Sequence, residues 1–217
     1  KSDQIKPKIV LASFPRSGNT FLRNVLYEVY GIYSWNNIER FNASLDRYNT
    51  LLEKKTRKGN LNPDKDEKLK DLEHHFRYKA MKSHELPVKT LPLCEEDPII
   101  IYLVRDGRDA LVSTAHHRKD IVKPGSDFIK NLKEAIKAQM GTYFGGWGHN
   151  VEEWLKIAHI IFRFEDFIKD PVAHTEKLRQ FIPLPEPDLN NIPTFDSQKS
   201  GEAHFGGKAR KKLSKEE

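Results

Sequence analysis

A short loop rich in hydrogen-bond donors follows the first apolar run of the chain. Residues 13–20 read SFPRSGNT, and a helical pattern begins directly after them. A glycine turn between a strand and a helix aims backbone N–H groups and the positive end of the helix dipole at one point, which favours an anion. Ser17, Asn19 and Thr20 add side-chain donors. Arg16 adds a forked positive charge. We therefore predict a phosphate-binding loop; the alternative is an ordinary turn with a surface arginine.

This loop differs from the nucleotide triphosphatase loop GxxxxGK[ST] at two positions. With Thr20 at its last position, that pattern requires Gly and Lys where this chain has Ser13 and Asn19, whereas Gly18 matches its second Gly. Thr20 matches the hydroxyl that binds magnesium. The loop therefore lacks the lysine that contacts a γ-phosphate, which argues against a magnesium-dependent nucleotide kinase.

Three further sets of polar residues follow later apolar runs. His84 comes two residues after Lys82, and an imidazole with an ordinary pKa near 6.5 can accept a proton at neutral pH. Arg105 closes the next run, and Ser113 follows eight residues later, so both could bind one phosphate. Phe164 ends the last run. The alternatives are a structural histidine, weak surface ion pairs around Arg105, and a core phenylalanine.

The elements that must position these residues alternate between strands and helices. Apolar runs predict strands over 8–14, 78–83, 99–104 and 158–164. Helical spacing or start signals predict helices over 20–30, 109–117, 127–140 and 172–181, the last with Asp170 as N-cap and Pro171 at its first position. Two strands are almost continuously apolar, as a sheet covered on both faces requires. We expect one three-layer α/β domain over 1–217, with a mostly parallel central sheet flanked by helices.

Composition and charge restrict the function classes. The 217 residues contain 37 Lys and Arg against 31 Asp and Glu, which gives a net charge of +6. This excess suits an anionic ligand or surface. Basic segments are interleaved with acids, so we expect no nucleic-acid partner. Cys94 is the single cysteine, which excludes an internal disulfide and a CxxC metal site.

No apolar run is long enough for a transmembrane helix, and no signal-peptide pattern is present. We expect a cytoplasmic protein. His116, His117 and His149 are interpreted as structural residues, and we expect no metal.

Two segments have no strand signal. Residues 31–77 predict a helical insertion, either a solvated pair of helices or a lid over a pocket. We expect residues 201–217 to form an exposed, mobile tail.

On these motifs the chain resembles the sulfotransferases that use 3′-phosphoadenosine 5′-phosphosulfate (PAPS). Residues 13–23, SFPRSGNTFLR, are similar to the family's 5′-phosphosulfate loop, with Arg16 where many members have Lys and Phe21 where many have Trp. Residues 82–87, KSHELP, are similar to the segment that carries the family's general base. Arg105 and Ser113 match its 3′-phosphate element. Phe164 stands where the family has a tyrosine near the adenine, and residues 146–151 resemble a helix start of the same family.

The resemblance implies a P-loop-like sulfotransferase fold and a mechanism. A sulfuryl group would pass from PAPS to a hydroxyl or amine by in-line displacement, with adenosine 3′,5′-bisphosphate (PAP) as product and no metal. His84 would be the general base. Arg16 would stabilise charge on the bridging oxygen, and Lys82 charge on the sulfuryl oxygens. The donor site would comprise the following residues: Arg16, Ser17, Gly18, Asn19, Thr20, Phe21, Arg105, Ser113 and Phe164.

Several alternatives stay open at this point. A nucleotide kinase and a non-catalytic bisphosphate-binding module share parts of the pattern. Residues 205–208, FGGK, do not match the family's C-terminal 3′-phosphate segment, so either the given sequence stops short of that segment or that part of the pocket is built differently. The acceptor could be a small molecule, a glycan or a lipid. Trp35, Phe41, Tyr48 and Phe76 could line its pocket or belong to the core. The oligomeric state is not predicted.

Overall fold

A five-stranded parallel sheet forms the centre of the protein. The computed structural model describes residues 5–57, 67–138, 142–199 and 204–205. The strand order is β2-β3-β1-β4-β5, and every pairing is parallel. The strands are β1 (Ile9–Ala12), β2 (Ser34–Trp35), β3 (Ala80–Ser83), β4 (Ile99–Val104) and β5 (Ile160–Arg163).

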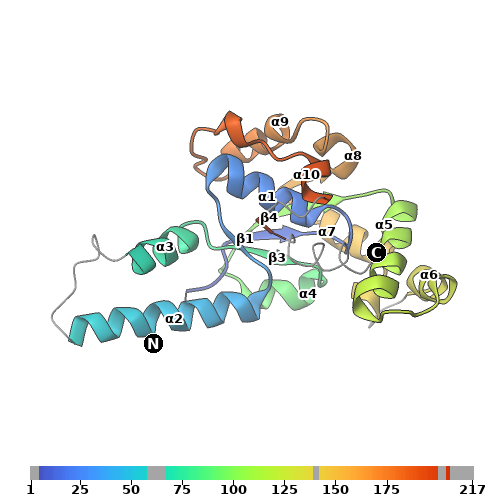
Figure 1. Cartoon of the computed structure of the whole chain (residues 1–217), viewed down its shortest axis with the longest axis horizontal. Coiled ribbons are helices and arrows are strands. Elements are labelled where there is room, and N and C mark those ends of the chain that lie inside the picture. Colours follow the sequence, from blue (N-terminus) through green and yellow to red (C-terminus); the bar gives the residue numbers. More distant parts are fainter. Residues whose placement is uncertain (1–4, 58–66, 139–141, 200–203, 206–217) are drawn as a thin grey trace.

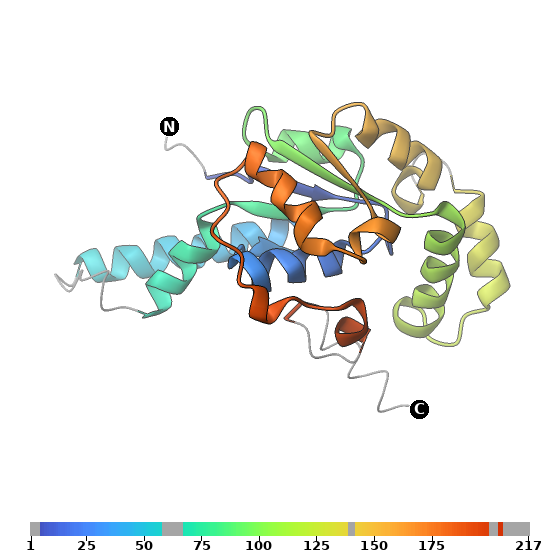
Figure 2. The same ribbon diagram turned by 90° about the horizontal axis from the view of Figure 1, so that it is seen from above.

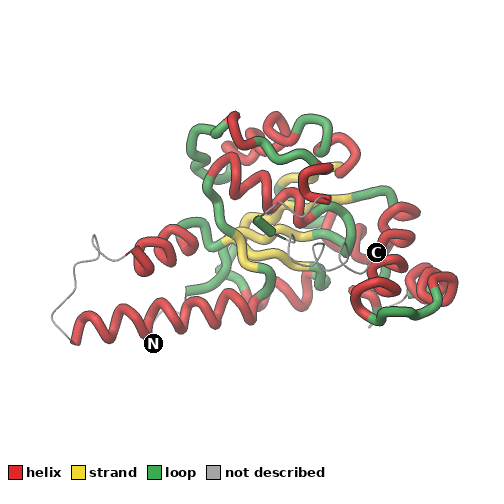
Figure 3. The backbone as a smooth tube through the Cα atoms, in the orientation of Figure 1, coloured by secondary structure: helices red, strands yellow, loops and turns green. Residues whose placement is uncertain are grey.

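Helices surround this sheet, as Figure 1 shows along the chain and Figure 3 by element type. Those of the first half are α1 (Asn19–Tyr30), α2 (Ile38–Arg57), α3 (Glu67–Phe76), α4 (Pro87–Thr90) and α5 (Gly107–His117). Those of the second half are α6 (Phe128–Ile136), α7 (Trp147–Leu155), α8 (Phe164–Phe167), α9 (Pro171–Thr175) and α10 (Phe195–Lys199). The predicted three-layer α/β fold is confirmed.

Burial of β1 on both faces explains its unbroken apolar sequence. Ile9 and Leu11 belong to the cluster that includes α1, α8 and the segment after α9. Val10 and Ala12 belong to the opposite cluster, with Trp154 of α7 and Cys94, which is a free thiol. Alternate side chains of a strand point to opposite faces, so both faces of β1 must be apolar.

Two pairs of helices lie at opposite ends of the molecule. α2 and α3 project from one end, and α5 and α6 lie at the other (Figures 1 and 2). Residues 31–77, for which a helical insertion is predicted, contain α2, α3 and also β2, and residues 58–66 lie outside the described residues. The sequence analysis missed β2, whose two residues are too few for a pattern. Trp35, Phe41 and Phe76 pack on one another, with Tyr48 at the edge, as a small core.

Helix boundaries differ from the predictions by a few residues. Asp170 caps α9 as predicted, accepting a hydrogen bond from the backbone N of Ala173 at 3.0 Å. That helix then tightens into a 3₁₀ turn over Glu176–Gln180. α5 begins two residues early because the Asp106 carboxylate caps it. α6 ends at Ile136, and most of the predicted tail, residues 201–217, lies outside the described residues.

The carboxyl ends of the strands lie level with one another. Ala12 pairs with Ser83 on one side and with Tyr102 on the other, and Val104 pairs with Arg163. The loop after β1, His84, Arg105 and Phe164 therefore emerge at one edge of the sheet, where open α/β sheets bind ligands. None of the described helices is long and apolar enough to cross a membrane.

Candidate active site

The loop between β1 and α1 adopts a backbone that few residues tolerate. Arg16 has φ 64° and Gly18 has φ 95°, and Gly18 caps α1 without a side chain. A Cβ at Gly18 would lie 2.3 Å from Cδ2 of Phe164. Only glycine therefore allows the Phe164 ring to lie against the loop. Left-handed backbone at a non-glycine residue is strained, and such strain gathers at functional sites.

The polar side chains of this loop have two different roles. The Asn19 amide donates to the carbonyl of Leu11 (2.9 Å) and to the hydroxyl of Ser13 (3.1 Å), so it braces the loop against β1. The Ser17 hydroxyl is buried and has no hydrogen-bond partner within the described ranges. Thr20 is partly exposed in the first turn of α1. A buried hydroxyl without a partner is costly unless a ligand satisfies it.

The Arg105 and Ser113 pair reaches the loop directly. Nη1 of Arg105 donates to the carbonyl of Arg16 (3.0 Å), and Nε of Arg16 donates to the Ser113 hydroxyl (3.2 Å). The Arg105 guanidinium also lies 4.8 Å from the centre of the Phe164 ring. Its Nε is buried and unpaired among the described residues. The structure thus brings together residues from β1, β4, α5 and α8 that are up to about 150 positions apart.

His84 is held in one tautomer. Its Nδ1 lies 2.7 Å from the carbonyl oxygen of Ser13, and a carbonyl only accepts, so Nδ1 carries the proton. Nε2 is then the acceptor. Burial, and after it the positive charge of Lys82, lowers the pKa of His84 to about 3. The imidazole is therefore neutral at physiological pH.

A buried asparagine that the sequence analysis missed positions His84. The Asn150 amide donates to the backbone carbonyls of His84 (3.0 Å) and Phe144 (3.1 Å) and accepts from the Tyr102 hydroxyl (3.0 Å). Phe144 in turn meets the His84 ring edge-on, with 5.9 Å between ring centres. The sequence analysis identifies segment 146–151 only as resembling a helix start, and no sequence signal distinguishes Asn150 from a surface asparagine.

Positive charge gathers around His84. Burial, and after it the charges of Arg23 and Arg16, lowers the pKa of Lys82 to about 8. Arg23 is also buried, which lowers its pKa to about 10, and its guanidinium donates to oxygens of Ser34. Neither Lys82 nor Arg23 has a carboxylate partner in the described part of the chain. The sequence analysis did not single out Arg23, although its position inside α1 offered a signal.

His117 is another residue at the margin of this site. Burial lowers its pKa, and the charges of Arg16 and Lys82 contribute. It follows Ser113 by four residues and so lies on the same face of α5. The four-residue spacing from Ser113 is the sequence signal that could have placed His117 near the site.

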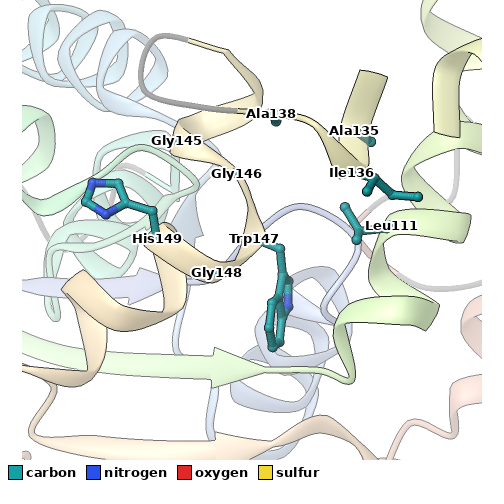
Figure 4. Close-up of a pocket in the computed structure, with 9 residues that line it drawn as sticks. All are labelled: Leu111, Ala135, Ile136, Ala138, Gly145, Gly146, Trp147, Gly148 and His149. Carbon is teal, nitrogen blue, oxygen red and sulfur yellow. The ribbon is translucent and has the colours of Figure 1, made fainter. Parts of the chain in front are cut away.

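The remaining predicted residues lie around the site. The Phe21 ring is buried in the core against Phe167 and Phe195, so only its backbone could contribute to a nucleotide site. Trp147 donates to the carbonyl of Arg105 (3.2 Å) and covers Gly107. Figure 4 shows Trp147 and His149 leaving α7 in different directions, with Trp147 at an apolar cavity of about 470 Å³ that Leu111 and Ile136 also line.

Together these features define a class of protein. A parallel α/β sheet carries the glycine-containing loop after its central strand, a basic element with Arg105 after the next strand, and a neutral histidine between cations. Such a site suits a ligand with two separate anionic groups.

Comparison with known proteins identifies the family. A family model described as Sulfotransferase domain matches residues 6–213. The chain belongs to the sulfotransferase domain family. Flavonol 3-sulfotransferase of Flaveria bidentis is 26% identical over 196 residues, which cover 82% of this chain and 57% of the relative. Sulfotransferase 1E1 of Mus musculus is 27% identical over 185 residues, covering 80% and 58%. The chain thus spans less than three-fifths of each relative.

Solved structures share the fold. Mouse sulfotransferase SULT7A1 complexed with PAP has a TM-score of 0.59 at 21% identity, over 91% of this chain and 68% of that one. A sulfotransferase from Alicyclobacillus acidocaldarius has a TM-score of 0.52 at 14% identity, over 95% and 94%. The predicted sulfotransferase fold is confirmed.

Proposed function

We propose that this chain is a PAPS-dependent sulfotransferase that modifies a hydroxyl group. The observation that carries the proposal is the arrangement around His84: a neutral imidazole with Nε2 as acceptor, beside Lys82 and Arg16. A kinase of the same general fold would need a lysine at Asn19, and the amide there is already bonded to β1.

The residues present fit a PAP-type nucleotide. The unpartnered hydroxyl of Ser17 and the start of α1 suit a 5′-phosphate, and the unpaired Nε of Arg105 with Ser113 suits a second, 3′-phosphate. The Phe164 ring lies beside the Arg105 guanidinium and against Gly18 of the loop, where it could contact the adenine. PAPS, when bound, supplies the activated sulfuryl group.

The chain's own residues would divide the remaining work. His84 would accept the proton of the acceptor hydroxyl at Nε2, while Ser13 keeps the other nitrogen protonated. Arg16, Lys82 and the loop N–H groups would stabilise the negative charge that develops nearby. An anion beside Lys82 and Arg16 would also offset the two charges that help to lower the pKa of His84, which would make it a stronger base.

A thermal-shift titration tests the donor half of this proposal. We expect PAP to stabilise the protein by about 2.7 kcal/mol at 100 times its dissociation constant, with ADP and ATP–magnesium giving smaller shifts. Arg105→Ala should remove the preference for PAP. A shift with ATP–magnesium alone would instead support a kinase, and equal shifts with all three nucleotides would contradict a 3′-phosphate site.

A further inference from the structure

The structure assigns a charge to the acceptor: we infer that it is an anion whose negatively charged part binds a basic groove along α6. We call this the α6 groove. It has a volume of about 830 Å³ and lies between the end of α5, α6 and residues 142–143. The inference rests on the proposed function, because it concerns the partner substrate of the same site.

Unbalanced lysines give the α6 groove its charge. Lys130 and Lys133 line it from α6, Lys137 lines it from the residue that follows the helix, and all three are exposed. Spacings of three and four residues place them along one side of this segment. No carboxylate lies within ion-pair distance of any of them in the described part of the chain.

The two carboxylates of the groove are already engaged. Asp127 caps α6 by accepting from the backbone N of Lys130 at 2.6 Å. Glu134 pairs with Arg118, with 3.5 Å between Nη2 and Oε2. The net charge presented to a ligand is therefore positive, which attracts polyanions and repels cationic acceptors.

The α6 groove connects with the catalytic histidine through two adjacent residues. Tyr143 lines the groove, and its hydroxyl accepts a hydrogen bond from Arg118. Phe144 contacts His84. Tyr143 and Phe144 both have positive φ, 40° and 56°. This backbone directs the Tyr143 side chain to the groove and the Phe144 side chain to His84. On the α5 side, His117 feels the charges of Arg16 and Lys82, and Arg118 is the next residue.

This arrangement suits an extended acceptor with a hydroxyl at His84 and carboxylate, sulfate or phosphate groups farther along the same molecule. A flat neutral acceptor would leave the three lysines without a role. Exposed Ile129 beside Lys130 adds a small apolar contact to the groove.

A matched pair of polymers tests the inference. Carboxymethyl-dextran and unmodified dextran of equal length both carry hydroxyl groups, and only the first is an anion. Binding of each to the full chain is measured by calorimetry at low and high salt. We expect carboxymethyl-dextran to bind, more weakly as salt rises, and dextran not to bind. The combined variant Lys130→Gln, Lys133→Gln and Lys137→Gln should weaken that binding about tenfold.

A control variant carries the same charge change elsewhere. Lys8, Lys70 and Lys177 are exposed and lie outside the groove, and their combined change to Gln should leave polymer binding within about twofold. Both triple variants should bind PAP as the unaltered chain does. PAP binding separates the two proposals. If the unaltered chain does not bind PAP, the nucleotide site is refuted, whichever polymer the chain binds.

Three outcomes would overturn the inference. They are equal binding of both polymers, equal loss in the two triple variants, and no loss in the α6 variant. Vesicles of phosphatidylserine and phosphatidylcholine form a further arm. If the lysines govern binding to these vesicles while carboxymethyl-dextran does not bind, the groove is a membrane contact and the acceptor inference is wrong.

Discussion

At the residue scale, the environment of His84 determines how the protein should respond to pH. Burial and Lys82 hold its pKa near 3, whereas an unfolded chain would have a pKa near 6.5. Between these values the unfolded state binds more protons, so the stability contribution of this residue falls as pH falls from about 6.5 towards 3.

The same pKa predicts the pH dependence of activity. The acidic limb of kcat/KM, which reports the free enzyme, should lie well below pH 6.5. The limb of kcat should lie at higher pH than that of kcat/KM, because the bound donor places anionic charge beside Lys82. Rate profiles from about pH 3 to 8 test both limbs. His84→Ala should lower kcat by about 10²–10⁴-fold without changing PAP affinity. His116→Ala, which changes an exposed histidine, should leave both kcat and PAP affinity unchanged. Limbs that coincide near pH 6.5 would contradict this view of His84.

Gly18 offers a stability test of the loop geometry. Gly18→Ala would place a Cβ 2.3 Å from Phe164 at φ 95°, and we expect a loss of about 2–5 kcal/mol from overpacking and backbone strain. Gly125→Ala is the matched control. Gly125 has φ 78° but nothing within 4 Å, so only the strain of about 1–2 kcal/mol applies. Equal losses in urea unfolding would show that Phe164 does not close against the loop.

At the scale of elements, Asn150 ties α7 to the end of β3. Asn150→Ala removes bonds to His84, Phe144 and Tyr102, and leaving these buried groups unpaired should cost about 2–5 kcal/mol. We expect kcat to fall more than PAP affinity in the folded fraction, because the loss displaces His84 rather than the loop.

The control for this change is another buried asparagine. Asn131 of α6 donates to the Ser126 hydroxyl and makes no contact with His84. Asn131→Ala should therefore reduce stability while keeping kcat. If both variants lose stability and keep kcat, Asn150 is a structural residue alone.

Strand and helix order was predictable because the buried strands are nearly continuous apolar runs. The hydrophobic pattern does not predict elements that are very short or whose ends are determined by packing. β2 has only two residues, and the helix predicted over 172–181 changes to a 3₁₀ turn after Thr175. The role of Asn150 depends on His84 and Tyr102, two partners distant in sequence, which no local pattern encodes.

At the scale of the whole molecule, the parallel sheet explains why separate motifs form one site. Each motif follows a strand, and level carboxyl ends bring Arg16, Arg105 and His84 to one edge. Side-chain direction was not predictable in the same way. Asn19 turns back to β1, and the Phe21 ring enters the core, although the sequence analysis predicts both as residues of the donor site.

The central claim is that this edge of the sheet recognises a nucleotide by its 3′-phosphate. Calorimetric titration with PAP and with adenosine 5′-monophosphate tests it most directly, in the unaltered chain, in Arg105→Ala and in Arg108→Ala. Arg108 is an exposed arginine paired with Asp106 and serves as the control. We predict that the unaltered chain and Arg108→Ala bind PAP at least about tenfold more tightly than the monophosphate, and that Arg105→Ala loses this preference. Equal affinity for the two nucleotides in the unaltered chain would contradict the account.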